Sequence, residues 1–341
     1  MELKKQYIGL DVVKFILAIL VAMRHMIQIF FTAESRGHLV IGSWLSNLAV
    51  PSFFMMSGFF LFRKVEAGQK DGYVIKKYSF KIIRMYLIWS VIYWPINWYD
   101  WYHGETGPAE ALLKYIQSFF FSSSIAQLWY LPALLTACLL IWFCYTRGMK
   151  IWQILVTSSG LLLVGYIGDN WYVNEMLPHS MYLKLMEYNK YFLTMRNGLF
   201  YGTFYVAAGL WFAKHPQRLP LWASAAGSVA FTGLMYWEVV HIHNTNIILS
   251  AVLAVSCLFM AASEIGGKPR QLYTRLRVMS EWIYLSHFYF FYLFSWTLPW
   301  NPVPVNNKTV LMMLMGATVL FSWLMTRLSE TKRFGWLKKL I

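Results

Sequence analysis

The sequence is poor in charge, and poorest in acidic charge. Only 13% of its 341 residues are charged, and Asp and Glu together number 15. A soluble domain carries about 25% charged residues, so this composition excludes an ordinary soluble globular protein. Hydrophobic residues make up 58% of the chain, and the mean hydropathy is +0.45. The chain is therefore expected to be a polytopic membrane protein.

Cysteine is scarce as well. The three cysteines, Cys138, Cys144 and Cys257, all lie in apolar segments, and their number is odd. A disulfide framework uses an even number of cysteines, and metal sites show short characteristic spacings that are missing here. We expect neither a disulfide framework nor a metal site.

Aromatic residues are abundant, at 19% of the chain, which is typical of proteins that cross two membrane–water interfaces. A membrane-spanning helix needs about 20 mostly apolar residues. The sequence predicts an all-α bundle of about ten such spans, at residues 11–32, 41–62, 80–99, 128–146, 151–168, 197–213, 219–237, 244–263, 280–298 and 309–326.

The basic residues orient these spans. With the N-terminus in the cytoplasm, 22 of the 30 lysines and arginines fall in internal segments, six fall in external segments, and Lys14 and Arg24 lie within the first span. This asymmetry supports ten spans with both termini cytoplasmic. It also accounts for the net charge of +15 without nucleic acid, because the charge faces the anionic cytoplasmic leaflet.

Two of the external segments are long. Residues 100–127 and 169–196 each carry several polar and charged side chains. Connections of this length are uncommon unless they have a function. We expect both segments to fold back over the helices and to shape an outward-facing pocket.

The first span carries titratable residues in an apolar setting. Lys14 and His25 are eleven residues apart, which is about three helical turns, so they share a face with Asp11, while Gln28 extends this stripe outward. Arg24 points about 100° away from His25. One interpretation is structural, with Lys14 reaching the cytoplasm and His25 bonded to a neighbouring helix. The other is a water-accessible path with His25 as a general base, since neutral imidazole is abundant at pH 7.

Several motifs in chain order resemble the acyltransferase-3 family of integral membrane proteins. Lys14-x10-His25 is similar to the basic-x10-His signature of that family's first span. Four further stretches resemble its later spans: VPSFFMMSGFFLF at 50–62, KIIR at 81–84, LWYLPALL at 128–135 and SEWIYLSHFYF at 280–290.

Within that family the chain is most similar to the membrane domain of vancomycin-resistance membrane-bound serine racemases, through GDNW at 168–171, RNGLFYG at 196–202 and LWYLPALL. In those proteins the membrane domain is associated with L-serine supply, and a cytoplasmic racemase domain follows it. We expect residues 1–341 to form a single acyltransferase-3-like transmembrane domain with no soluble racemase domain. The chain is then either a stand-alone relative or a fragment that ends before such a domain, and a cytoplasmic racemase domain or partner is one of the expected partners.

The resemblance implies a membrane enzyme of the bacterial cytoplasmic (inner) membrane. Members take an acyl group, often acetyl, from cytoplasmic acyl-CoA and place it on an extracytoplasmic hydroxyl, such as that of a cell-envelope glycan. Carried over to this sequence, the resemblance implies that His25 is the general base and that Lys14 lies at the cytoplasmic entrance of the acyl-CoA path. Lys81 and Arg84, one helical turn apart, are candidates to clamp the CoA phosphates together with Lys14, or else are ordinary cytoplasmic anchors.

The remaining candidates concern substrate binding. Arg24, Gln28 and His287 belong to spans, whereas Asp169 and Arg196 lie at opposite ends of one external segment and are candidates to hold a zwitterion such as serine. Three functions stay in competition: an acyl-CoA-dependent O-acyltransferase, an L-serine transport module, and a non-catalytic scaffold for envelope enzymes.

Overall fold

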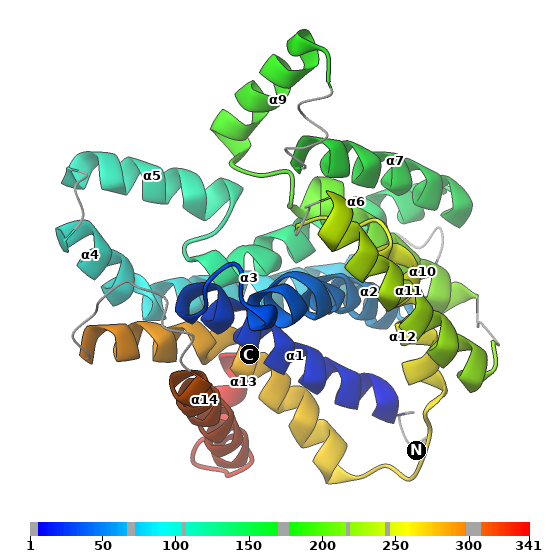
Figure 1. The fold of residues 1–341 in the computed structure, drawn as a ribbon. Coiled ribbons are helices and arrows are strands. Elements are labelled where there is room, and N and C mark those ends of the chain that lie inside the picture. The colour runs from blue at the N-terminus through cyan, green and yellow to red at the C-terminus, as the bar shows by residue number, and fades with distance from the viewer. Residues whose placement is uncertain are drawn as a thin grey trace. The chain divides into compact units, whose positions relative to one another are not determined.

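A computed structural model describes residues 6–66, 72–103, 107–169, 177–215, 219–242, 246–297 and 308–341. All regular structure among these residues is helical (Figure 1). The expected all-α class is therefore confirmed for the described part of the chain. Lys4, Lys5, Lys70 and Arg218, which enter the charge count, and Asn170 and Trp171 of the GDNW motif lie outside the described residues.

The helices divide into two compact units, each described here by itself. The first unit contains residues 1–53, 217–241 and 250–341. Its elements are α1 (Ile8–Phe30), a π-helical turn η1 (His38–Trp44), η2 (Leu45–Leu48), the start of α2 (Ala49–Phe62), α11 (Leu221–Ile242), α12 (Ala251–Glu264), α13 (Gln271–Thr297), α14 (Lys308–Ser329) and η5 (Gly335–Lys339).

The second unit contains residues 54–216 and 242–249. Its elements are the rest of α2, α3 (Tyr73–Ile92), α4 (Trp94–His103), α5 (Pro108–Phe121), η3 (Ala126–Trp129), α6 (Tyr130–Thr146), α7 (Ile151–Asp169), α9 (His179–Phe192), a π-helical turn η4 (Gly198–Gly202) and α10 (Thr203–Lys214).

Helix α1 is the centre of the first unit. It packs along α13 and also touches α12, α14 and η1. Its close approach to α12 depends on Gly9, because a Cβ there would collide with the carbonyl oxygen of Ala262. At the other end of α1, the buried Met26 and Ile27 join Leu314 of α14 in one apolar cluster. Small residues at helix crossings are the usual means of close packing in membranes.

Helices α1 and α13 run in the same direction. Asp11, Lys14 and Phe30 of α1 meet residues of increasing number on α13, namely Arg277, Glu281 and Phe291. The first and ninth of ten consecutive spans must also point the same way, so this pairing agrees with the expected topology. The number of spans itself stays a prediction.

Helix α6 has the same role in the second unit, where it contacts α3, α7, η4 and α10. The backbones of α2 and α10 approach closely, since a Cβ at Gly58 would meet Val206 and one at Gly209 would meet Met55. Ser57 contacts the Tyr130 hydroxyl at 3.2 Å. Both Ser57 and Gly58 thus take part in helix packing.

Four described helical stretches are long and apolar enough to cross a membrane: His38–Phe62, Pro108–Thr146, Ile151–Asp169 and Lys308–Ser329. They overlap the expected spans at 41–62, 128–146, 151–168 and 309–326. Described helices also overlap the other six expected spans.

The expected span at 80–99 is wrong as a single helix. Helix α3 begins earlier, at Tyr73, and ends at Ile92, and α4 starts after one turn residue. Pro95 is the cause: it has no N–H to continue the hydrogen bonding of α3, yet it fits the first turn of a new helix.

The expected span at 244–263 also starts too early. Helix α12 begins at Ala251. The buried carboxylate of Glu238 on α11 accepts hydrogen bonds from Ser250 N (2.9 Å) and Ser250 Oγ (2.6 Å). A carboxylate beside a helix N-terminus satisfies free N–H groups and complements the helix dipole, so Glu238 fixes where α12 starts.

Candidate functional site

Two ion pairs join α1 to α13 in the first unit. Lys14 Nζ lies 3.0 Å from Glu281 Oε1, and Arg277 Nη1 lies 3.4 Å from Asp11 Oδ1. On α1 the acid precedes the base, and on α13 the base precedes the acid. Because each pair of neighbours is about one turn apart, the two contacts hold the parallel helices in one register.

A pair of histidines lies further along the same contact. The rings of His25 and His287 are stacked, with centroids 5.4 Å apart and an interplanar angle of 22°. Phe288 presents its edge to both rings, at 4.8 Å from His25 and 5.1 Å from His287. We call this contact surface, formed by Asp11, Lys14, His25, Arg277, Glu281, His287 and Phe288, the α1–α13 seam.

The hydrogen bonding of His287 fixes its tautomer. Its Nδ1 lies 2.9 Å from the carbonyl oxygen of Ile283, which can only accept, so Nδ1 carries the proton. In the neutral ring the lone pair then sits on Nε2. This atom is buried, and no described residue hydrogen-bonds to it. Buried polar atoms without a hydrogen-bond partner are uncommon in folded proteins, which makes His287 Nε2 a distinctive feature of this contact.

Arg24 points away from the seam, as the helix geometry predicts. Its Nη1 donates to Asn47 Oδ1 at 2.6 Å and lies 3.4 Å from Ser46 Oγ. Arg24 therefore pairs with the side-chain carbonyl of an asparagine on a neighbouring segment. Gln28, one turn beyond His25, is exposed.

Lys81 and Arg84 lie on α3 in the second unit. Lys81 is exposed and Arg84 is half-buried, and Arg84 Nε is buried without a described hydrogen-bond partner. Because α3 begins at Tyr73, Lys77 joins them on nearly the same face of one helix. This geometry can present several cations to a phosphate.

Residues of both long segments that the sequence predicts to be external line one cavity of about 250 Å³, also in the second unit. Phe121 comes from the first segment and Phe192 from the second, and their rings meet edge to face. The two segments therefore shape a pocket, as the sequence indicated. We call it the aromatic cavity, and its walls comprise Phe120, Phe121, Ser122, Trp129, Pro132, Ala133, Thr136, Tyr188, Phe192, Thr194, Arg196, Asn197, Gly198 and Leu199.

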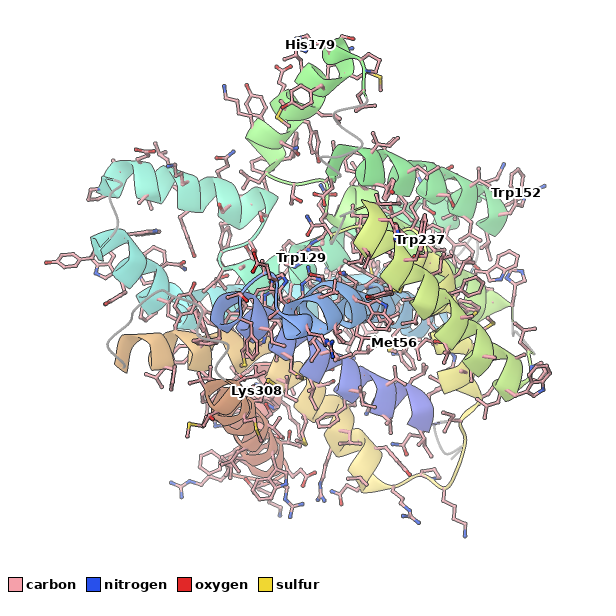
Figure 2. The ribbon with its side chains drawn as sticks, viewed as in Figure 1. Met56, Trp129, Trp152, His179, Trp237 and Lys308 are labelled. Atoms are coloured by element: carbon pink, nitrogen blue, oxygen red, sulfur yellow. The ribbon has the colours of Figure 1, made fainter. Side chains whose placement is uncertain are left out.

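Arg196 lies in the wall of the aromatic cavity, above the ring of Trp129, which is labelled in Figure 2. Its guanidinium carbon is 4.5 Å from the ring centroid. Nη1 donates to Asn246 Oδ1 at 3.2 Å. Asp169 is not among the lining residues, but its Oδ1 accepts from Thr194 Oγ1 at 3.4 Å, and it attracts the Arg196 charge.

The local backbone explains how Arg196 is held. Asn197 caps the π-helical turn η4, because its Oδ1 accepts from the backbone N–H groups of Leu199 and Phe200. Gly198 allows the turn to approach α6, since a Cβ there would collide with the Ala133 carbonyl oxygen. π-helical turns are frequent at functional sites.

Sequence reasoning missed the partners of the candidate residues. Glu281 and Arg277 lie one turn apart on α13, so their complementarity to Asp11 and Lys14 was a readable signal. Asn246 gave no such signal, because it lies 50 residues from Arg196 in sequence.

Comparison with known proteins gives the family. The class defined so far is a helical membrane protein with a histidine-containing seam in one unit and a cation-bearing cavity in the other. Residues 7–327 match the family described as "Acyltransferase domain". The chain belongs to this acyltransferase-3 family, as its motifs predicted.

Curated relatives come from enterococci. The chain is 29% identical over 225 residues to an "Amino-acid racemase" of Enterococcus faecalis and 24% identical over 292 residues to a "Serine/alanine racemase" of Enterococcus gallinarum. The alignments cover 64% and 82% of this chain, but only 30% and 40% of those relatives. The chain thus spans less than half the length of these relatives. No solved structure matches.

Proposed function

We propose that this chain is an acyl-CoA-dependent O-acyltransferase of a bacterial cytoplasmic membrane, with His25 as its general base. The observation that carries the proposal is the α1–α13 seam, where an imidazole of the family's signature is held against a second, buried imidazole. Such a pair has little structural use in an apolar bundle, and ionisable groups within a span are functional by default.

The seam supports the chemistry of acyl transfer. Neutral His25 takes the proton of the acceptor hydroxyl while that oxygen attacks the thioester carbonyl. The new C–O bond forms, the C–S bond breaks, and the imidazolium returns its proton to the departing CoA thiolate. His287 and Phe288 hold the His25 ring in place through ring contacts.

Phosphate binding by Lys81 and Arg84 is a separate part of the proposal. A planar guanidinium and a neighbouring ammonium suit the phosphates of CoA. The acetyl group as donor and a hydroxyl of an envelope glycan as acceptor complete the proposed reaction.

The test is the binding of acetyl-CoA and of L-serine to the purified protein, with His25→Ala and the Lys81→Ala/Arg84→Ala double variant. We expect acetyl-CoA binding that His25→Ala retains and the double variant loses, together with acyl transfer that His25→Ala loses. Wild-type protein that fails to bind acetyl-CoA would refute the acyltransferase proposal.

A second candidate is passage of L-serine or a similar amino acid. It is favoured by the names of the relatives, an amino-acid racemase and a serine/alanine racemase. Asp169 and Arg196 would bind the ammonium and carboxylate groups. Saturable L-serine binding that Arg196→Gln abolishes, with no acetyl-CoA binding, would favour this candidate.

A further inference from the structure

The aromatic cavity of the second unit has a chemistry that neither acyl transfer nor serine passage requires. Five of its lining side chains are aromatic: Phe120, Phe121, Trp129, Tyr188 and Phe192. Arg196 is the one charged residue among the lining residues of this described region. The cavity therefore offers apolar walls and a single cation.

Four other polar side chains in the wall, Thr136, Tyr188, Thr194 and Asn197, are already engaged. Thr136 Oγ1 donates to the Pro132 carbonyl oxygen, and Thr194 Oγ1 donates to Asp169 and accepts from Arg196 N. Asn197 Nδ2 donates to the Tyr188 hydroxyl and to the Thr194 carbonyl oxygen. A ligand with many hydroxyl groups, or with an ammonium group, would find few partners here.

Arg196 keeps most of its hydrogen-bonding capacity. Its guanidinium has five N–H donors, and within the described part of the chain only the bond from Nη1 to Asn246 is formed. Asp169 attracts the charge, but no ion pair within 4 Å joins the two among the described residues. The cation–π contact with Trp129 restrains the position of the guanidinium. A planar, preorganised guanidinium with unused donors suits a bidentate carboxylate.

From this arrangement we infer that the aromatic cavity is a binding site for a small amphipathic organic anion, with its carboxylate on Arg196 and its apolar chain or ring among the aromatic side chains. A volume of 250 Å³ equals about eight water-sized volumes. It therefore accommodates an apolar body of roughly eight carbons, which is much larger than the side chain of serine. The site lies wholly within the second unit and does not depend on the proposed acyl transfer.

The test uses octanoate as the probe and octanol as its uncharged match. The 341-residue protein is reconstituted in nanodiscs of zwitterionic lipid, because a detergent tail would compete for the cavity. Calorimetry then gives the affinity for octanoate, octanol, inorganic phosphate and L-serine. We expect saturable octanoate binding, at least tenfold weaker octanol binding, and no binding of phosphate or serine at the same concentrations.

Variants of Arg196 test whether octanoate binds in the aromatic cavity. Arg196→Gln is expected to weaken octanoate binding at least tenfold and to leave octanol binding unchanged. The octanoate affinity of Arg196→Lys is expected to lie between those of Arg196→Gln and the wild type. Arg147→Gln is the matched control, because Arg147 also lies in the second unit and stacks on an aromatic ring, Phe143, at 4.7 Å, outside the cavity. Thermal unfolding checks that each variant is folded.

Two results would overturn the inference. One is equal affinity for octanoate and octanol, and the other is unchanged octanoate binding in folded Arg196→Gln protein. L-serine that displaces octanoate at equal concentration would overturn the assigned ligand class. Nanodiscs with anionic lipid test whether the natural anion is a lipid headgroup. If anionic lipid weakens octanoate binding to the wild type but not to Arg196→Gln, the site is supported and its natural anion is a lipid headgroup.

Discussion

The α1–α13 seam and the aromatic cavity surround their charged side chains in opposite ways. In the seam each charged side chain of α1 meets an opposite charge on α13, within 3.4 Å for Asp11 and 3.0 Å for Lys14. In the cavity Arg196 has an aromatic face and an amide as its neighbours.

This difference indicates a structural role for the paired charges of the seam and a ligand-binding role for Arg196. Opposite charges in contact avoid the large cost of leaving one charge unpaired away from water, and the two pairs fix the register of the two helices. The Arg196 cation lacks a carboxylate at contact distance in the described structure, so its donors are directed at a ligand. The seam is thus built to hold an imidazole, and the cavity is built to receive an anion.

The largest effect is expected from removing the imidazole of the seam. His25→Ala should lower the rate of acyl transfer by about 10²–10⁴-fold, the usual contribution of a general base, while acetyl-CoA binding is kept. The measurement is transfer from labelled acetyl-CoA in membrane vesicles. His241→Ala is the control, since His241 also belongs to the first unit and stacks on a ring, that of Trp237, yet is exposed. Equal loss in both variants would contradict a special role for His25.

Adding a side-chain atom where α1 and α12 touch should push the two helices apart and so disturb the packing of α1 that the seam depends on. Gly9→Ala places a Cβ against the Ala262 carbonyl oxygen, and overpacking of this kind costs about 1–3 kcal/mol. Thermal unfolding should show a lower midpoint. Gly233→Ala on α11 has open space around its Cβ, and its greater helix propensity should leave the midpoint unchanged or raise it. A midpoint unchanged by Gly9→Ala would exclude the close approach.

Exchanging the charges of one seam pair should sharpen the comparison. Lys14→Glu and Glu281→Lys each place like charges side by side, and each should destabilise the protein by about 1–2 kcal/mol, because the pair is partly exposed. The double exchange should recover most of the loss. The measurement is a double-mutant cycle, in which midpoints of thermal unfolding are compared for the wild type, the two single variants and the double variant. Additive losses in the double variant would show that the two side chains do not interact.

The smallest effect concerns an ion pair at the surface of the first unit. Arg275 donates two hydrogen bonds to the Glu330 carboxylate, at 2.8 and 2.9 Å, and these lower the pKa of Glu330 below its ordinary value of 4.5. A lowered folded-state pKa stabilises the protein above the unfolded pKa, and this stabilisation is lost as pH falls through the folded value. The midpoint difference between wild type and Glu330→Gln should be slight at pH 7 and should vanish in acid. A difference that grows as pH falls would contradict this assignment.

The amino-acid sequence predicted much of the secondary structure correctly. Composition indicated the membrane, and apolar runs located helices such as α6 and α7 to within two residues, because membrane spans need long apolar segments with internally satisfied backbones. The wheel geometry of α1 separated His25 from Arg24 correctly. The expected 80–99 span failed at Pro95, although a proline in that position was itself a visible signal.

The sequence by itself therefore determined the helical membrane class, the family and the polar face of α1, since these follow from hydrophobicity and from spacing along one helix. Tertiary structure alone decided that this face meets Arg277, Glu281 and His287, and that Arg196 lies over Trp129 with Asn246 beside it. The physical reason is separation: Lys14 and Glu281 are 267 residues apart, and no local pattern encodes which helices pack together. That choice is made by the whole set of packing contacts at once.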